Sequence, residues 1–191
     1  MMKKSRERTN LEDTAATPRT GGGGSTSSGA ASSQKQVILY TDGACLGNPG
    51  PGGYGVVLLY GERRKELSGG YRLTTNNRME ILAAIRGLEA LKVPCSVTLY
   101  SDSQYLVNGI TKGWAKRWRA NGWKRNSREK ALNADLWERL LNLCSLHRVT
   151  FVWVRGHADI KENERCDILA NEAAGQADLE EDHGYLQKAS F

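Results

Sequence analysis

The stretch from Val37 to Gly53 constrains this chain most, because it joins a buried strand to a carboxylate and then to glycines and prolines. Residues 37 to 40 are apolar or β-branched and predict a strand that ends in Thr41 and Asp42. The core of an α/β sheet excludes charge, whereas ligands bind at the carboxyl ends of its strands. Asp42 is therefore a candidate site residue, and the glycines after it would let a loop approach a ligand. The alternative is that Asp42 opens an Asx turn.

A second carboxylate follows a second predicted parallel strand. Short turns after the glycine-rich stretch predict an antiparallel meander, and a helix-favouring segment then predicts a crossover to a strand parallel to the first. These segments are strands over 54–60 and 64–73, a helix over 79–91 and a strand over 97–101. The last strand ends in Asp102. If the two parallel strands are neighbours, Asp42 and Asp102 lie at the same end of the sheet.

The crossover helix carries a third acid, Glu80, on the face formed by Ala83, Ala84 and Gly87. Small residues allow this face to pack closely on the sheet, which would turn Glu80 towards the other acids. The alternative is a capping box, in which Asn77 caps the helix and Glu80 reaches back to it. If Thr75 is the cap instead, Glu80 lies in the second turn and cannot close the box.

The segment from Lys112 to Lys130, called the basic segment below, has the composition of a nucleic-acid-binding surface. It holds eight basic residues, one acid and three tryptophans. The charges would meet phosphates, and the rings would meet sugars or bases. The alternative is a solvated helix whose tryptophans pack on each other, and at least one of the three is expected to be structural. The candidate contact residues are Trp114, Lys116, Arg117, Trp118, Lys124 and Arg125.

The last third of the chain adds a histidine and a fourth acid. Hydrophobic periodicity predicts a helix over 133–144, a strand over 148–154 and a final helix that ends at 174. His157 lies in the loop after that strand, and Asp167 lies in the first turns of the final helix. A lone histidine in a loop is usually a surface residue, and an Asp early in a helix is favoured by the macrodipole alone. His157 and Asp167 are therefore candidate site residues only because the chain also carries the other three acids. The elements predict a single α/β domain with a five-stranded mixed sheet, an antiparallel meander plus parallel strands, flanked by helices.

Composition indicates a basic domain between two tails. The chain has 191 residues and a formal net charge of +6, and removal of residues 1–34 and 178–191, which carry six basic and seven acidic groups, leaves +7. A basic domain points to a polyanionic partner. Residues 1–34 are rich in Gly and Ser and predict a disordered tail. Residues 178–191 are interpreted as an acidic C-terminal tail. The remaining residues, 35–177, form the predicted catalytic domain, which carries all the candidate site residues.

Cysteine use and hydropathy point to a cytoplasmic protein. The four cysteines lack metal-site spacing and are interpreted as free thiols of a reducing cytosol. No apolar run has the length of a membrane helix, and the N-terminus lacks the apolar core of a signal peptide. We expect a soluble protein without a membrane partner, and we expect a monomer.

Four carboxylates and a histidine, without a Ser or Cys partner, suit hard divalent cations. Mg²⁺ takes oxygen ligands, keeps several waters and is usually shared with substrate phosphate. The residue set therefore predicts phosphodiester hydrolysis, in which one of two ions generates the attacking hydroxide and the other stabilises the leaving oxygen. A cluster of like charges is unfavourable without ions, so the site should be incomplete when metal-free.

Motifs spread along the chain resemble bacterial-type ribonuclease HI over residues 36 to 175. They are Tyr-Thr-Asp-Gly-Ala, Thr-Thr-Asn-Asn-Arg-Met-Glu, Ser-Asp-Ser-Gln-Tyr, Gly-His-Ala and Glu-Asn-Glu-Arg-Cys-Asp, in unbroken order. The resemblance implies the ribonuclease H-like fold and endonucleolytic cleavage of the RNA strand of RNA–DNA hybrids, leaving 5′-phosphate and 3′-hydroxyl ends. It also implies two Mg²⁺ ions bound with substrate, with Mn²⁺ as a substitute.

The resemblance also implies a role for each matching residue. The metal ligands would be Asp42, Glu80, Asp102 and Asp167, and His157 would assist proton transfer and product departure. The residues that meet the minor groove of the hybrid, where the 2′-hydroxyl distinguishes RNA from DNA, would be Asn48, Asn76, Asn77 and Gln104. Thr75 and Asn133 would hold a phosphate of the DNA strand. The basic segment matches the basic protrusion of the family.

Two positions depart from the family pattern, and two other functions compete with the first. Asp159 stands close after His157 where relatives often have Gly and Pro, and Leu73 stands where some members have a basic residue. An integrase- or resolvase-like DNA nuclease would keep the fold, but the asparagines and the basic segment argue against it. A hybrid-binding module without turnover would be expected to lack one of the acids, and all four are present.

Overall fold

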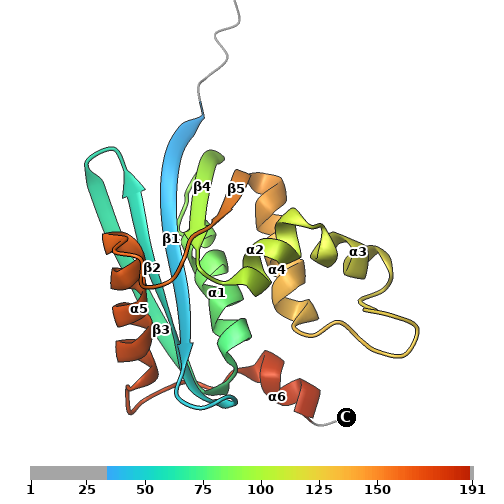
Figure 1. Cartoon of the computed structure of the whole chain (residues 1–191). Coiled ribbons are helices and arrows are strands. Elements are labelled where there is room, and N and C mark those ends of the chain that lie inside the picture. The colour runs from blue at the N-terminus through green and yellow to red at the C-terminus, as the bar shows by residue number, and fades with distance from the viewer. Residues whose placement is uncertain (1–33, 190–191) are drawn as a thin grey trace, which may run out of the picture. The chain divides into compact units, whose positions relative to one another are not determined.

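The structure is a computed structural model that describes residues 34–189, and the predicted tail at 1–34 lies almost entirely outside this range (Figure 1). The strands are β1 Lys35–Cys45, β2 Gly50–Tyr60, β3 Arg63–Thr74, β4 Cys95–Ser101 and β5 Arg148–Trp153. The helices are α1 Asn76–Glu89, α2 Gln104–Thr111, α3 Trp114–Ala120, α4 Ala134–Leu146, α5 Lys161–Ala174 and α6 His183–Ala189.

The five strands form one mixed sheet in the order β3-β2-β1-β4-β5, which confirms the predicted α/β fold. The pairs β1–β2 and β2–β3 are antiparallel, whereas β1–β4 and β4–β5 are parallel. The crossover through α1 therefore returns the chain parallel to β1, as the order of the segments predicts. Helices α1 and α5 pack on opposite faces of the sheet (Figure 1).

The main core lies between the sheet and α1, α2 and α4. Ala83 and Ala84 on α1 are fully buried, and a Cβ atom built on Gly87 would lie 3.1 Å from Leu39 Cδ1. This contact confirms the predicted small-residue face of the helix. Trp137 from α4 is fully buried in the same core.

The glycine-rich stretch is strand rather than loop, so the prediction of a long ligand-approaching loop over 43–53 is wrong. Strand β1 continues to Cys45 and pairs there with Gly52, which leaves only residues 46–49 as a turn. A Cβ atom on Gly55 would lie 2.1 Å from Cys166 O, and one on Gly53 would lie 2.2 Å from Ala170 O. The strand glycines therefore let α5 approach the sheet. Helix packing outweighs their low intrinsic strand preference.

The expected acidic tail at 178–191 is also corrected for the residues that the structure describes. Leu179 and Asp182 are buried, Glu180 forms a parallel bridge with Tyr71, and α6 follows. The segment is acidic, as its composition indicates, but it docks on the domain because Asp182 pairs with the buried Arg78.

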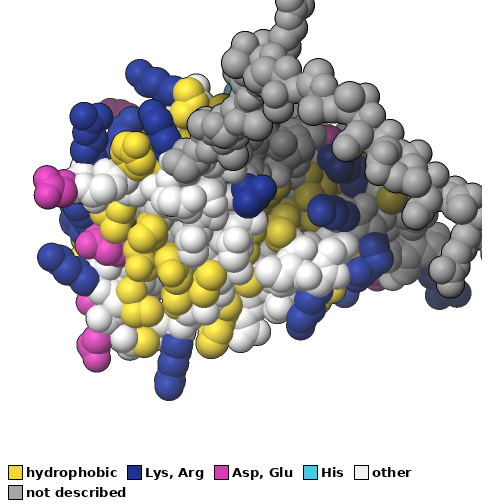
Figure 2. Space-filling view, turned by 90° about the horizontal axis from the view of Figure 1, so that it is seen from above, with side chains coloured by type: hydrophobic (Ala, Val, Ile, Leu, Met, Phe, Trp, Pro, Cys, Tyr) yellow, Lys and Arg dark blue, Asp and Glu magenta, His cyan; other side chains and the backbone are white. Residues whose placement is uncertain are grey.

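The charge on the surface agrees with the basic composition of the chain. Lys and Arg side chains predominate over Asp and Glu on the face drawn in Figure 2. Within residues 34–189 no helix combines the length and the apolar character needed to cross a bilayer. Cys45, Cys95, Cys144 and Cys166 are all free thiols.

Candidate active site

Asp42 lies where the sheet divides. Pairing between β1 and β4 ends at Tyr40 and Tyr100, and beyond this point β1 pairs only with β2. The Asp42 side chain is 8% exposed, and its Oδ1 accepts a hydrogen bond of 2.7 Å from the backbone N–H of Gly43. Asp102 follows directly after β4. The two acids therefore lie at the same end of neighbouring parallel strands, as predicted.

One cavity of about 390 Å³ brings together all five predicted catalytic residues. Strand β1 contributes Asp42, the end of β4 contributes Asp102, and helices α1 and α5 contribute the other two acids. The lining residues are Asp42, Gly43, Ala44, Cys45, Asn76, Glu80, Asp102, His157, Asp167 and Asn171. Residues more than 100 positions apart in the sequence thus face one space.

Glu80 is held by two side chains and takes no part in a capping box. Thr75 is the N-cap residue of α1 and makes no side-chain cap bond, so the capping-box alternative is wrong. Asn76 Nδ2 donates to Glu80 Oε1 at 2.8 Å, and Ser103 Oγ donates to Glu80 Oε2. Glu80 lies in the second turn of the helix with its carboxylate turned towards the cavity.

Three polar residues that orient the acids were missed in the sequence. Ser103 is the N-cap of α2 as well as the donor to Glu80, a pairing that no local pattern contains. Asn171 Nδ2 donates to Asp167 Oδ1 at 2.8 Å, and Asn163 Nδ2 lies 3.5 Å from Asp102 Oδ2. The two asparagines are each four residues from Asp167 on α5, a spacing that could have indicated one shared helix face.

Burial and mutual repulsion raise the pKa values of two of the acids. Burial is the larger cause for Asp42 and the neighbouring Asp102 carboxylate is the second, and together they raise the pKa of Asp42 to about 8. Burial also raises the pKa of Glu80 to about 7, against the opposing hydrogen bond from Ser103. The protein by itself thus penalises negative charge at the site, and a bound cation would remove the penalty.

The donor set fits hard divalent cations that are completed by water and substrate. Carboxylate oxygens are the ligands that Mg²⁺ prefers, and Mg²⁺ is usually held by only one or two carboxylates together with phosphate. Within residues 34–189, no three Asp, Glu, His or Cys side chains converge tightly enough to hold an ion by themselves. Asn163 Oδ1 is buried and finds no hydrogen-bond partner in the same residues, which leaves an acceptor that an ion's water would satisfy.

His157 lies on the exposed loop between β5 and α5 and lines the cavity. Its φ angle is 52°, and that of Asp159 is 57°, so both residues adopt the left-handed conformation that favours glycine. Gly156 beside it has no room for a side chain, because a Cβ atom there would lie 2.7 Å from Asp102 Oδ2. The loop thus brings the imidazole to the cavity from outside the sheet.

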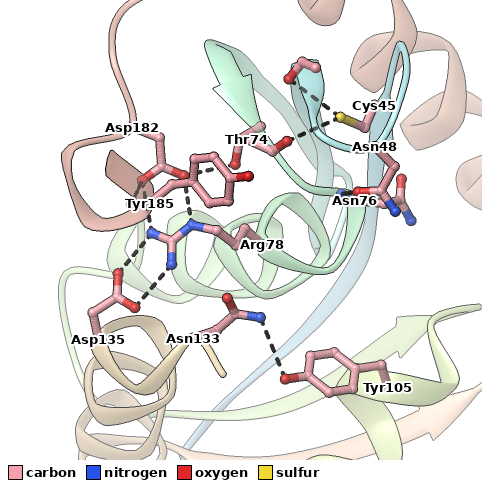
Figure 3. Close-up of polar contacts among 11 residues, drawn as sticks. Cys45, Asn48, Thr74, Asn76, Arg78, Tyr105, Asn133, Asp135, Asp182 and Tyr185 are labelled. Atoms are coloured by element: carbon pink, nitrogen blue, oxygen red, sulfur yellow. Dashed lines mark hydrogen bonds and ion pairs between the residues drawn. The ribbon is translucent and has the colours of Figure 1, made fainter. Parts of the chain in front are cut away.

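The predicted hybrid-contact residues lie in the β1–β2 turn, at the starts of α1 and α2 and just before α4, and of these residues Asn76 lines the cavity. Asn48 Oδ1 accepts a hydrogen bond of 3.3 Å from the N–H of Asn76, which ties the β1–β2 turn to the start of α1 (Figure 3). Asn77 and Gln104 are exposed. Asn133 is buried, precedes α4 with a φ of 58°, and its Nδ2 lies 3.5 Å from Tyr105 Oη. Thr75 is half-buried beside them, and the departure at Leu73 is solvent-exposed.

The basic segment forms α3 and the loop that follows it, to the right of the sheet in Figure 1. Trp118 packs edge-on against the core residue Trp137 with ring centroids 6.2 Å apart, so at least one tryptophan is structural, as expected. Lys116, Arg117 and Lys124 are exposed. A second cavity, of about 380 Å³, is lined by Tyr105, Trp114, Arg117, Trp118, Arg125, Ala131 and Leu132.

A mixed α/β sheet with four acids in one cavity and a basic aromatic segment beside it defines a nuclease-like protein. The family model described as RNase H matches residues 34–175. The chain is 84% identical over 152 residues to the ribonuclease H of Syntrophus aciditrophicus. The matched region covers 80% of this chain and 88% of that protein. The chain therefore belongs to the ribonuclease H family, and its identity to curated relatives makes it an enzyme of the bacterial HI type.

Solved structures agree with this assignment. LC9-RNase H1, a type 1 ribonuclease H with the type 2 active-site motif, superposes on this chain with a TM-score of 0.68 and 33% sequence identity. The superposition covers 83% of this chain and 82% of the LC9-RNase H1 chain. LC11-RNase H1 in complex with an RNA/DNA hybrid has a TM-score of 0.56 and 28% identity, covering 72% of this chain and 96% of its own. The predicted ribonuclease H-like fold is confirmed.

Proposed function

We propose that this protein hydrolyses the RNA strand of RNA–DNA hybrids as an endonuclease, leaving 5′-phosphate and 3′-hydroxyl ends. The observation that carries the proposal is the single cavity lined by Asp42, Glu80, Asp102, His157 and Asp167. Membership of the ribonuclease H family supports the same activity, and the relative LC11-RNase H1 has been solved with an RNA/DNA hybrid.

The four acids would bind two Mg²⁺ ions, with Mn²⁺ as a substitute, and would share them with the scissile phosphate. Two ions in this position would supply an activated water and neutralise the charge on the leaving oxygen. The protein's own part is to orient the carboxylates, which Asn76 and Ser103 do for Glu80 and Asn171 does for Asp167. An imidazole nitrogen of His157 would move a proton during hydrolysis and product departure.

Selection of a hybrid would come from Asn48, Asn76, Asn77 and Gln104, beside the acids. Amide groups can both donate to and accept from the 2′-hydroxyl, which is what distinguishes RNA from DNA in a minor groove. Thr75 and Asn133 would hold a phosphate of the DNA strand. The exposed cations of the basic segment would add contacts to the backbone of the hybrid.

Cleavage of labelled duplexes tests the proposal. Each of RNA–DNA, RNA–RNA and DNA–DNA duplexes is incubated with the protein in Mg²⁺ or in EDTA, and the product ends are mapped. We expect cleavage of the RNA–DNA hybrid alone and only with the metal. Cleavage of DNA–DNA would favour the integrase-like alternative, and tight hybrid binding without turnover would favour the binding module. We further propose a monomeric cytoplasmic protein, which sedimentation and cell fractionation would test.

A further inference from the structure

Arg78 is the most deeply buried charge in the part of the chain that the structure describes, at 2% exposure in the first turn of α1. Its guanidinium lies between two carboxylates from distant segments (Figure 3). Nη1 and Nη2 donate to Asp135 Oδ1 and Oδ2 at 3.0 and 2.7 Å. Nε and Nη2 donate to Asp182 Oδ2 and Oδ1 at 2.7 and 2.8 Å.

Asp182 is buried as well and accepts from more than the arginine. Thr74 Oγ1 donates to Asp182 Oδ2 at 2.7 Å, and the N–H of Tyr185 donates to Oδ1 at 3.1 Å. Residues 178–189, called the C-terminal strap below, also bond along β3, where the N–H of Arg72 donates to Glu180 O at 2.8 Å. The strap is thus joined to the end of β3 and to the start of α1.

Two of the partners of Asp182, Thr74 and Arg78, flank the junction of β3 and α1 that carries the proposed hybrid contacts. Thr74 precedes Thr75 and Asn76, and Arg78 follows Asn77. The other carboxylate on Arg78, that of Asp135, lies in the first turn of α4, two residues after Asn133. One guanidinium therefore connects the junction at 74–78, the start of α4 and the C-terminal strap.

We infer that the C-terminal strap positions the hybrid-binding surface. Asp182 is the positioning residue, and it holds residues 74–78, the junction of β3 and α1, at a fixed position relative to Asn133. This inference rests on the proposed hybrid-binding function. A buried guanidinium between two carboxylates has one well-bonded arrangement. Removing the charge of Asp182 leaves Arg78 paired with Asp135 alone and weakens the hydrogen bonds of its Nε and Nη2 groups. This segment would then shift, and the groove contacts on it would lose their alignment. Asp42, Asp102 and Asp167 lie on other elements, and Glu80 on α1, which would lose the support of Asn76, keeps its hydrogen bond from Ser103.

Three variants test the strap. Asp182→Asn removes the buried charge. Thr74→Val removes only the hydroxyl bond and keeps the ion pair, so it gives a folded variant even if Asp182→Asn is unstable. Glu181→Gln changes an exposed neighbouring acid and serves as the control. We expect the first two to raise KM for the hybrid by about tenfold, as one lost hydrogen bond would. We expect kcat to stay within about threefold, since binding lost equally in ground and transition states leaves kcat unchanged.

Affinity for a fluorescent hybrid in EDTA and Tm by calorimetry accompany the kinetics. Weaker hybrid binding by the two strap variants, seen as a higher Kd and a matching rise in KM, supports the inference. If neither the wild type nor any variant cleaves, that result contradicts only the proposed activity, and the Kd values still test the inference. A purely structural strap would lower Tm while the folded variants keep wild-type KM and Kd, and that result would overturn the inference. A fall in kcat at unchanged KM would overturn it too.

Discussion

At the scale of single residues, the site depends on carboxylates that are buried beside one another. Asp42 is the most enclosed of the four, and burial together with Asp102 accounts for its raised pKa. His157 differs from them, because it is exposed and lies on the loop between β5 and α5. The acids and the histidine should therefore respond differently to substitution.

We expect Asp42→Asn to abolish nearly all cleavage while hybrid binding persists. The amide keeps the shape of the side chain but removes a negative ligand, and transition-state stabilisation depends on that charge. Single-turnover cleavage and hybrid affinity measured on the same preparation check this. Substantial activity in the variant would contradict the metal-ligand role.

We expect His157→Ala to lower kcat by about 10- to 10⁴-fold, the usual contribution of a general acid or base. Mg²⁺ affinity should stay at the wild-type value, since the imidazole moves a proton and does not bind the ion. Calorimetric titration with Mg²⁺ provides the comparison, and a joint loss of rate and metal affinity would mean that His157 is a ligand.

At the scale of secondary-structure elements, the catalytic site depends on how closely α5 packs against β2. The proposed binding surface depends on how α3 of the basic segment is attached to the core. Glycines in β2 set the first distance, because carbonyls of α5 occupy the space of the missing side chains. Packing of Trp118 on Trp137 anchors α3 to the core and leaves its lysines and arginines in solvent. One element thus positions a catalytic acid, and the other offers charge to a polyanion.

Gly55→Ala should destabilise the fold and displace Asp167. The new Cβ would lie 2.1 Å from Cys166 O, one residue before Asp167, so α5 must move outward. Overpacking of this kind costs about 1–3 kcal/mol in the free energy of unfolding. Gly175→Ala is the matched control, because its nearest neighbour would lie at 3.6 Å. Urea unfolding and cleavage rates report both effects, and a wild-type rate in Gly55→Ala would contradict the positioning by α5.

Replacing Lys116, Arg117, Lys124 and Arg125 with Ala should raise KM and flatten its salt dependence. Each phosphate contact contributes about −0.9 to the log–log slope of affinity against salt on B-DNA. Saturating kcat should persist, because the segment would hold substrate and does not line the cavity of the acids. Steady-state kinetics over a salt series decide the matter. A collapse of kcat with KM and salt slope unchanged would make the segment structural or catalytic.

At the scale of the whole molecule, metal, proton and stability are linked through the cluster of acids. The folded, metal-free protein raises the pKa of Asp42 to about 8 from an ordinary 3.8, so it binds a proton more tightly than the unfolded chain does. The stability that this proton provides is complete at pH below about 4 and is lost as pH rises through about 8. A cation that binds the deprotonated site replaces the proton.

Mg²⁺ should therefore raise Tm more at pH 9 than at pH 6. An ion at about 100 times its Kd adds about 2.7 kcal/mol to the free energy of unfolding, and competition with protons lowers this gain in acid. Thermal unfolding in Mg²⁺ or EDTA at both values of pH measures the difference. Asp42→Asn should show a smaller dependence on pH, and an equal gain at both values in the wild type would contradict the linkage.

Much of the fold and site follows from local patterns in the sequence. Apolar runs of strand length and helical periodicity give the order of the elements. Asp102 and His157 follow strands, Asp42 lies on β1, and Glu80 and Asp167 lie on helices. Outside the glycine-rich stretch, the predicted bounds are close to those observed, because both periodicities reflect which side chains of a segment are buried. The parallel pairing of β1 and β4 then brings Asp42 and Asp102 into one cavity, and the packing of α1 and α5 on the sheet adds Glu80 and Asp167.

The remaining features depend on contacts that no local pattern contains. Gly53 is a strand residue although a loop was predicted there, because α5 packs on it, and Ser103 reaches Glu80 from another element. The segment after 177 is acidic enough to suggest a solvated tail, yet it docks because Asp182 meets Arg78 from 104 positions away. The sequence by itself determined the elements and the chemical groups of the site. Only the tertiary structure decided which groups are buried together, because desolvation and pairing depend on neighbours brought close by folding.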